Sequence, residues 1–370
     1  MSYLIIVSGR EGTGMRRVFL VALILCLVFA GYAGYRLHAF LTSPPEKEGR
    51  EVFFDVVPGS RLSGIAERLA QDGIITDSFL FTLLARVHRM DKQFKSGRFA
   101  LKTSLTPLEV LEVLVHGKPV LYRITIPEGL PWWKTARLLA DQGFVSYDDF
   151  VAVVQDKAFL RRHGIPFANA EGFLMPDTYL LKREEQALAE GGENPKRVQA
   201  ERIAARLIDT FWKRAAPLWP SGKKPASDDL KRFVILASIV EKETGRANER
   251  ERVAGVYANR LARKMLLQAD PTVQYGLGPS FSGRLLYRHL DDPKNAYNTY
   301  QHQGLPPGPI CSFGTGALKA AIEPEKHDFL FFVARSDGGE HVFSKRLEDH
   351  NKAVEEYRKS VRKNRSEGVR

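Results

Sequence analysis

The sequence predicts an α+β protein with a single N-terminal transmembrane helix, a small β-α subdomain and a larger mixed α+β domain. Three observations lead to this prediction: a long uncharged apolar run near the N-terminus, a repeated strand-turn-helix pattern after it, and amphipathic helices interspersed with short strands over the rest of the chain. The chain has 370 residues, of which 44% are hydrophobic and 26% charged. This composition is typical of a folded globular protein, and the length accommodates about two or three domains.

The apolar run, Val18–Tyr35, contains no charged residue and is long enough to cross a bilayer as a helix. An arginine pair lies directly before it. The positive-inside rule therefore places residues 1–17 in the cytoplasm and the chain beyond the helix outside the plasma (inner) membrane. Small residues near the end of the run leave a cleaved signal peptide as the alternative, although no clean cleavage site follows. Met15 precedes the arginine pair, so Met1 and Met15 are both candidate start sites.

The formal net charge of +12 favours polyanionic partners, such as nucleic acid, anionic lipid or a cell-wall polymer. The basic residues are spread over many predicted helices, and the excess in residues 356–370 is typical of a solvated basic tail. We therefore predict no nucleic-acid partner. Cys26 lies in the apolar run and Cys311 far from it, so they cannot form a disulfide, and no Cys/His spacing matches a zinc site. No glycine-rich phosphate loop is present, and the sequence predicts neither a metal nor a cofactor.

After a polar linker at 36–50, residues 51–125 are predicted to form the small subdomain. A strand, a tight glycine turn and a short helix that ends at a second glycine occur here and again about 70 residues later. The matching positions are Gly59 and Gly129, Ala66 and Ala136, Leu69 and Leu139, Ala70 and Ala140, and Gly73 and Gly143. Small β-α units of this size resemble the LysM-type module, which binds glycan chains. A purely structural spacer is the alternative.

The larger domain is predicted over residues 126–355. An amphipathic helix over 198–212 presents apolar side chains on one face, and a second, more apolar helix is expected at 230–243. Near the end, the apolar strand 329–334 and the segment 341–343 flank a glycine pair, which predicts a β-hairpin. Helices and short strands together predict a mixed α+β domain.

Two glutamates, Glu241 and Glu243, end the apolar helix that begins near Leu230. Glu243 falls about 50° from the centre of the apolar face and Glu241 about 110° from it. Glu243 is therefore predicted to point into the fold, and Glu241 toward its edge. Burial raises a carboxyl pKa by penalising the charged form, which keeps the group protonated near neutral pH as a general acid requires. The alternative is that both glutamates are solvated charges that pair with Lys242 or Arg246.

Three downstream segments carry residue types that bind sugars. They are Gln268–Tyr275, Tyr297–Tyr300 and Gly304–Ile310, all expected to be loops. Aromatic rings stack on sugar rings, polar side chains bond to hydroxyl and acetamide groups, and a proline-glycine backbone makes a stiff cleft wall. The candidate substrate-binding residues are Glu241, Gln268, Asp270, Thr272, Tyr275, Tyr297, Asn298 and Tyr300, around Glu243 as the catalytic acid. This combination favours carbohydrate chemistry.

Together these segments resemble the MltG (YceG-like) family of endolytic murein transglycosylases. The motifs are I-V-E-K-E-T, D-P-T-V-x-Y-G, Y-N-T-Y and G-L-P-P-G-P-I, with E-G-x-x-x-P-D-T-Y upstream. The resemblance covers residues 16–355 and implies a LysM-like subdomain followed by a catalytic domain. It also implies cleavage of the β-1,4 bond between N-acetylmuramic acid and N-acetylglucosamine in peptidoglycan, with Glu243 as the catalytic residue. One departure is Cys311–Gly314, where the family usually has Asn-Pro-Gly.

The resemblance implies a lytic reaction that needs one carboxyl group. The acid protonates the glycosidic oxygen and the C6 hydroxyl of the same sugar attacks C1, which gives a 1,6-anhydro end without a metal or cofactor. A membrane anchor fits the termination of nascent strands and makes peptidoglycan synthases candidate partners. Two alternatives stay open: a non-catalytic peptidoglycan-binding scaffold, and a hydrolytic muramidase with Asp270 as its second acid.

Overall fold

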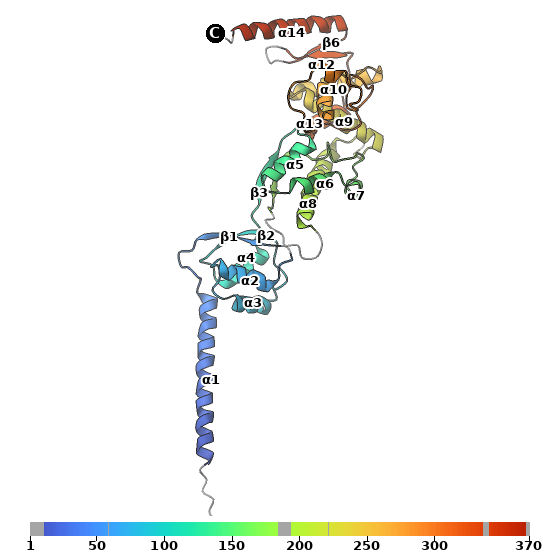
Figure 1. Ribbon diagram of the computed structural model, residues 1–370. Helices are drawn as coiled ribbons and strands as arrows, with labels where there is room; N and C mark the ends of the chain where they lie inside the picture. The colour runs from blue at the N-terminus through green and yellow to red at the C-terminus, as the bar shows by residue number, and fades with distance from the viewer. Residues whose placement is uncertain (1–10, 58, 184–193, 221, 336–339, 368–370) are drawn as a thin grey trace, which may run out of the picture. The chain divides into compact units, whose positions relative to one another are not determined.

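A computed structural model of the chain describes residues 11–57, 59–183, 194–220, 222–335 and 340–367. The chain divides into two compact units (Figure 1). Unit 1 ends at Leu121 and unit 2 begins at Tyr122. Each unit has its own hydrophobic core. Helices and short antiparallel sheets make up both, which confirms the α+β class.

Unit 1 begins with the helix α1, Glu11–Thr42. Within α1, Val18–Thr42 is long and apolar enough to span a membrane, with a mean hydropathy of 2.4. The helix continues beyond the expected end of the span at Tyr35, so the expected linker 36–50 is helical up to Thr42. The reason is that Phe40 is buried in the core of unit 1 and holds this last part of α1 against the unit.

The rest of unit 1 is a two-stranded sheet with three helices. Its elements are β1 (Glu51–Val56), α2 (Leu62–Gln71), α3 (Ser78–Val87), β2 (Gly97–Lys102) and α4 (Pro107–His116). β1 and β2 pair antiparallel, with Glu51 opposite Lys102. A capping box between Thr106 and Glu109 satisfies backbone donors at the start of α4. The aromatic centre of the core is formed by Phe54, Phe81 and Phe99.

Unit 2 starts with a second sheet and three helices. They are β3 (Tyr122–Ile126), α5 (Trp132–Asp141), α6 (Tyr147–Val154), α7 (Lys157–Arg162) and β4 (Asp177–Leu181). β3 pairs antiparallel with β4, which is why the second unit begins before residue 126, where the larger domain was expected to begin. Ile124 and Ile126 alternate with exposed residues and point into the core.

The internal repeat has the same local structure in both units. In each copy the strand is followed by a glycine in the left-handed region, Gly59 at φ 79° and Gly129 at φ 76°. The helix after it ends before another such glycine, Gly73 or Gly143, each at φ 71°. Each copy then continues through further helix to an antiparallel return strand, β2 or β4. The repeated strand-turn-helix prediction is therefore confirmed as local structure.

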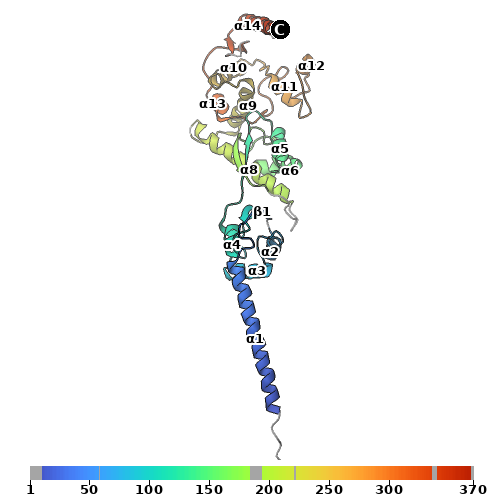
Figure 2. The ribbon, with the colours of Figure 1, turned by 90° about the vertical axis from the view of Figure 1, so that its left-hand side faces the viewer.

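The remainder of unit 2 includes the buried helix α9 and the helices that pack on it. Its elements are α8 (Pro195–Ala215), η1 (Ala216–Leu218), α9 (Ser227–Glu243), η2 (Ala247–Glu249), α10 (Arg250–Ala262), α11 (Asp270–Gly276), α12 (Tyr287–Leu290), α13 (Thr315–Ile322), β5 (Phe331–Val333), β6 (Val342–Ser344) and α14 (Leu347–Glu367). The helices α10, α11 and α13 contact α9, and Figure 2 shows it among them. Consequently α9 is buried from several sides.

Three expectations for unit 2 have definite outcomes. The segment Gln268–Tyr275, expected as a loop, forms α11 from Asp270, because Pro271 suits the first helical turn and Asp270 complements its dipole. The hairpin is confirmed as β5 paired with β6, while its glycine pair lies outside the described residues. The described part of the expected basic tail 356–370 continues the helix α14.

Candidate active site

Glu243 is the last residue of α9, a helix whose side chains from Phe233 to Val240 are all buried. The helix ends because Thr244 has an extended backbone, with φ −141° and ψ 127°, and Gly245 follows. The apolar packing of α9 therefore brings the Glu243 carboxyl to the edge of the core of unit 2, pointing into the fold as the helix phase predicts.

The Glu243 carboxyl lies among side chains from α10 and α11. Burial removes it from water and raises its pKa to about 7. The Tyr257 hydroxyl is its hydrogen-bond partner and offsets part of this rise, the negative charge of Asp270 adds to it, and the positive charge of Arg260 opposes it. A large fraction of the molecules therefore carries a protonated Glu243 at neutral pH, as general acid catalysis requires.

The groups around Glu243 are themselves held by hydrogen bonds. Arg260 is buried, and its guanidinium donates to the backbone carbonyls of Leu330 (2.7 Å) and Leu267 (2.8 Å). The Tyr300 hydroxyl donates to Asp270 Oδ1 at 2.6 Å. The structure thus brings together three of the predicted site residues, Glu243, Asp270 and Tyr300, from separate parts of unit 2.

Thr272 and Asn298, predicted to bind substrate, are fully buried and hold loops. The Thr272 hydroxyl lies 2.9 Å from that of Thr299. The Asn298 amide donates to three backbone carbonyls between residues 289 and 292, and its side-chain oxygen accepts the Tyr300 N–H at 3.0 Å. Their polar atoms therefore position the loops that carry the site. Gln268 stays exposed, with a left-handed backbone (φ 53°) that turns the chain into α11.

Glu241 does not lie at the edge of the fold, where the helix phase placed it. Its side chain is only 6% exposed. One oxygen accepts the Gly314 N–H at 3.1 Å, and the other lies 3.7 Å from the guanidinium of Arg250, which also contacts Glu128 at 3.5 Å. The prediction from helix phase that Glu241 points to the edge of the fold is wrong, because the loop before α13 and the start of α10 cover this side of α9. Both Glu241 oxygens are occupied by protein groups, so the structure separates it from the predicted substrate contacts.

A second buried acid, Glu171, has no role in the sequence-based prediction. Burial raises its pKa to about 8, although the backbone N–H groups of Trp132 (3.0 Å) and Gly172 (3.3 Å) and the Tyr275 hydroxyl bond to its carboxyl group. Glu171 opens the motif E-G-x-x-x-P-D-T-Y, which is the only sequence signal that pointed to it. It holds Tyr275, a predicted site residue, in place.

An aromatic row extends from this acid. The ring centroids of Trp133 and Tyr275 lie 4.8 Å apart, and those of Tyr275 and Tyr297 lie 4.9 Å apart. Trp133 and Tyr275 line a cavity of about 330 Å³ next to the end of α9 and the start of α11. Two lysines, Lys134 and Lys242, also line it, and no acidic residue of the described chain does. Trp133 has no local signal in the sequence, because it comes to Tyr275 only through the tertiary fold.

A larger cavity, of about 850 Å³, lies between β4 and α8. It is lined by Asp177, Arg206, Asp209 and Arg214 among others, and by none of the predicted site residues. Since its charged side chains include an ion pair at 2.9 Å between Arg214 and Asp177, we do not assign the chemistry to it.

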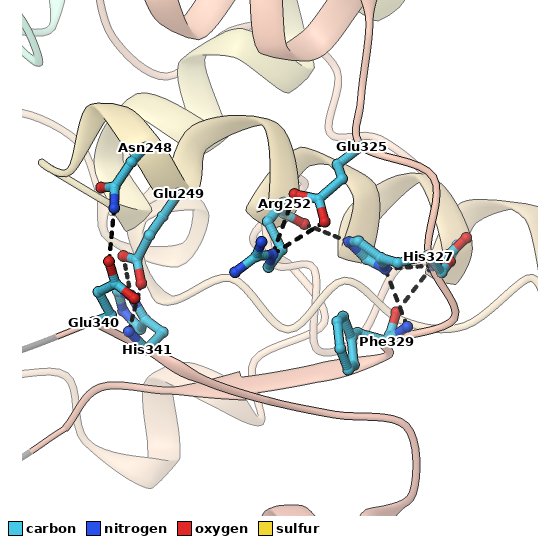
Figure 3. A network of polar contacts seen from close by, with 9 residues as sticks. Asn248, Glu249, Arg252, Glu325, His327, Phe329, Glu340 and His341 are labelled. Atoms are coloured by element: carbon cyan, nitrogen blue, oxygen red, sulfur yellow. Dashed lines mark hydrogen bonds and ion pairs between the residues drawn. The ribbon is translucent and has the colours of Figure 1, made fainter.

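A polar network fixes the chain directly after Glu243 (Figure 3). The Thr244 hydroxyl donates to Glu249 Oε2 at 3.3 Å, and Glu249 is almost fully buried. The backbone N–H of His341 donates to Glu249 Oε1 at 2.5 Å, and its ring Nδ1 lies 2.8 Å from Glu249 Oε2. Beside it, Asn248 donates to Glu340 at 2.7 Å. The segment that leads into β6 is thereby joined to the end of α9.

Among the residues that the structure describes, no three His, Cys, Asp or Glu side chains lie close enough together to hold a metal ion.

Comparison with known proteins shows which family the chain belongs to. Residues 54–356 match the YceG-like family. The chain belongs to this family. An endolytic murein transglycosylase of Bacillus subtilis is 30% identical, over 86% of this chain and 88% of its own length. One of Streptococcus pneumoniae (strain D39) is 28% identical, over 92% of this chain and 64% of its own length. A crystal structure of a yceG-like protein from Listeria monocytogenes has a TM-score of 0.51 at 28% identity, covering 82% of this chain and 98% of that chain.

The raised pKa of Glu243 predicts a pH-dependent cost in the stability of this YceG-like protein. Between the ordinary glutamate pKa of 4.5 and about 7, the unfolded chain releases this proton while the folded chain keeps it. The free energy of unfolding therefore falls over this window, by about 1–3 kcal/mol. The Glu243→Gln variant lacks this dependence, so its stability relative to the wild type should rise from pH 4.5 to 7 and stay level above. Denaturant titrations at several pH values measure this, and a difference that does not vary with pH contradicts it.

The network of Figure 3 predicts unequal effects for two glutamates. Glu249→Gln should lower the free energy of unfolding by about 2–4 kcal/mol, because it breaks a buried charged network. The control Glu325→Gln, whose side chain is 37% exposed beside Arg252, should cost less than about 1 kcal/mol. Burial acts to raise the pKa of Glu249, but the hydrogen bonds from His341 outweigh burial and lower this pKa. The stability that ionised Glu249 contributes is therefore present above the ordinary glutamate pKa, and it is lost as the pH falls through the lowered pKa. Equal effects of the two variants would refute this assignment.

Proposed function

We propose that the protein is a membrane-anchored lytic transglycosylase that cleaves the β-1,4 bond between N-acetylmuramic acid and N-acetylglucosamine within peptidoglycan strands. The observation that carries the proposal is the buried Glu243 carboxyl, with a pKa of about 7, in a unit where the preceding residue, Lys242, lines an aromatic cavity. The family and the names of the curated relatives support the same reaction.

Glu243 performs both proton transfers. Its protonated carboxyl donates to the glycosidic oxygen as the bond to C1 of N-acetylmuramic acid breaks, and positive charge develops on that sugar. The resulting carboxylate takes the proton of the C6 hydroxyl of the same sugar while this oxygen bonds to C1. The products are a 1,6-anhydro end and a free N-acetylglucosamine hydroxyl. Glu243 ends protonated, ready for another cycle, and no water is consumed.

Asp270 and Tyr300 support this chemistry electrostatically. The charge of Asp270 helps to keep Glu243 protonated before the reaction, and it stabilises positive charge that develops on the sugar. The bond from Tyr300, 2.6 Å long, fixes the Asp270 carboxylate in place. An intramolecular C6 nucleophile is favoured over water by its high effective concentration, so Asp270 is not needed to activate water.

The cavity lined by Trp133, Tyr275 and Lys242 is suited to the glycan. Trp133 and Tyr275, which line it, offer aromatic surface against which a sugar ring can stack, with Glu171 holding the Tyr275 hydroxyl. Lys134 and Lys242 place positive charge in the same cavity, which suits the carboxylates that N-acetylmuramic acid and its peptide carry. Gln268 and Tyr297 are proposed as further contacts along the strand.

The anchor sets where the enzyme acts. If α1 spans the inner membrane with the arginine pair on the cytoplasmic side, both units lie outside the cytoplasm, where peptidoglycan is assembled. There the enzyme terminates nascent strands, with peptidoglycan synthases as partners. Unit 1 is proposed as a LysM-like module.

The decisive experiment is the digestion of purified peptidoglycan by the full-length protein in detergent, with products identified by mass spectrometry. The wild type should release 1,6-anhydro products, and Glu243→Gln should be slower by about 10²–10⁴-fold because it cannot transfer the proton.

Asp270→Asn should still form anhydro ends, with the alkaline side of its pH profile moved to lower pH, because the pKa of Glu243 falls. Reducing ends from the wild type, abolished in Asp270→Asn, would instead identify a muramidase. Intact glycan with every protein would favour a binding scaffold.

The stacking surface gives a separate prediction. Trp133→Ala should raise KM about fivefold, the equivalent of about 1 kcal/mol of lost stacking. Trp133→Phe is the matched control, because it retains a ring and should keep most of the affinity. Steady-state rates on solubilised glycan strands measure both. An unchanged KM in Trp133→Ala would remove this residue from the substrate site.

A further inference from the structure

The helix α3 in unit 1 carries an apolar stripe that faces out of the protein. Phe79 is 73% exposed, Leu83 45% and Val87 70%. These residues are four positions apart, so they lie along one face of the helix. The opposite face, with Phe81 and Ala85, is buried in the core. Single exposed apolar residues are common on proteins, but a continuous stripe of large ones indicates a surface that is covered in use.

The stripe begins beside the end of the uncharged apolar run of α1. Arg36 is the first charged residue after the apolar run, and its guanidinium lies 3.4 Å from Asp77. Asp77 is the N-cap of α3 and accepts the Leu80 N–H at 3.0 Å. The first turn of α3 is therefore tied to the first charged residue after the apolar run of α1, a residue type that favours the head-group level of a bilayer.

The helix α1 is not a loose tether for unit 1. Phe40, one turn beyond Arg36, is buried among the core side chains of unit 1. Both views show α3 on the side of unit 1 from which α1 leaves (Figures 1 and 2). A bilayer crossed by α1 therefore has its surface close to α3.

The chemistry of the stripe fits the interface of a bilayer. Phenylalanine, leucine and valine bury favourably at the boundary between head groups and acyl chains. Exposed basic residues at the end of the helix, Arg86, His88 and Arg89, suit the phosphate groups and anionic lipids of that surface. An apolar face with basic residues beside it is the pattern of a helix that lies in the membrane plane.

We propose that the face of α3 formed by Phe79, Leu83 and Val87 lies in the lipid interface and seats unit 1 on the membrane. The contact adds a second attachment to α1 and fixes how unit 1 is oriented relative to the bilayer. The proposal depends on α1 crossing the membrane and is independent of the catalytic assignment.

The test uses the full-length chain in lipid vesicles with a fluorescent probe on single cysteines. Cys26 is replaced by Ser, and Cys311 is retained because it is buried and unreactive, with burial raising the pKa of its thiol. Cysteines replace Phe79, Leu83 or Val87 one at a time, and the matched control is Glu67→Cys on the exposed face of α2 in the same unit. Nitroxide-labelled lipids with the nitroxide at the level of the upper acyl chain then report contact with the bilayer.

The expected result is a blue-shifted emission at the three stripe positions that the labelled lipids quench, with water-like, unquenched emission at residue 67. Water-like emission at all four positions would overturn the proposal. A blue shift without quenching would also overturn it, because it would show that protein covers the stripe. Circular dichroism and digestion of peptidoglycan by each labelled protein confirm that the fold is intact, and loss of digestion alone leaves the probe result unaffected.

Discussion

The site depends on one constraint, the burial of α9. From Phe233 to Val240 this helix has no exposed side chain, and α10, α11 and α13 pack around it. A carboxyl group at the end of such a helix cannot be fully hydrated, and its pKa rises to about 7. The same packing that stabilises unit 2 therefore produces a carboxyl group poised between its two protonation states at neutral pH.

The neighbouring polar groups are rigid for a related reason. Arg260 is held by backbone carbonyls and Asp270 by Tyr300, so neither needs to reorganise when charge moves on Glu243. The start of α11 and the loop that carries Tyr300 are held by the buried side chains of Thr272 and Asn298. The turn of the second repeat copy also takes part, because the Gly129 carbonyl accepts a bond from Lys242 at 3.3 Å. The turn of the second repeat copy thus helps to line the cavity that also contains Trp133 and Tyr275.

The sequence predicts what depends on local periodicity and misses what depends on the tertiary fold. The direction of Glu243 follows from helix phase, and the repeat follows from glycines that need a left-handed backbone. The pairing of Glu249 with His341, 92 positions apart, has no local signal. Asn298 was predicted to bind substrate because its residue type suits sugars, but a side-chain amide suits a loop of backbone carbonyls equally well. The residue type indicates which interactions a side chain can make. Burial and contacts in the folded protein decide whether its partner is the substrate or the protein itself.

The choice between Glu241 and Glu243 illustrates this last step. Both glutamates lie in the last turn of one helix, and burial raises the pKa of both. Helix phase predicted that Glu243 is buried and Glu241 lies at the edge of the fold. The structure does not support this difference, since the Glu241 side chain is only 6% exposed. Their partners separate them instead. Glu241 accepts the Gly314 N–H and contacts Arg250, so both its oxygens face fixed protein donors. The hydrogen-bond partner of Glu243 is the hydroxyl of Tyr257, which leaves capacity to direct a proton toward a ligand. A general acid needs an oxygen that the protein does not occupy, and of the two glutamates Glu243 meets that condition.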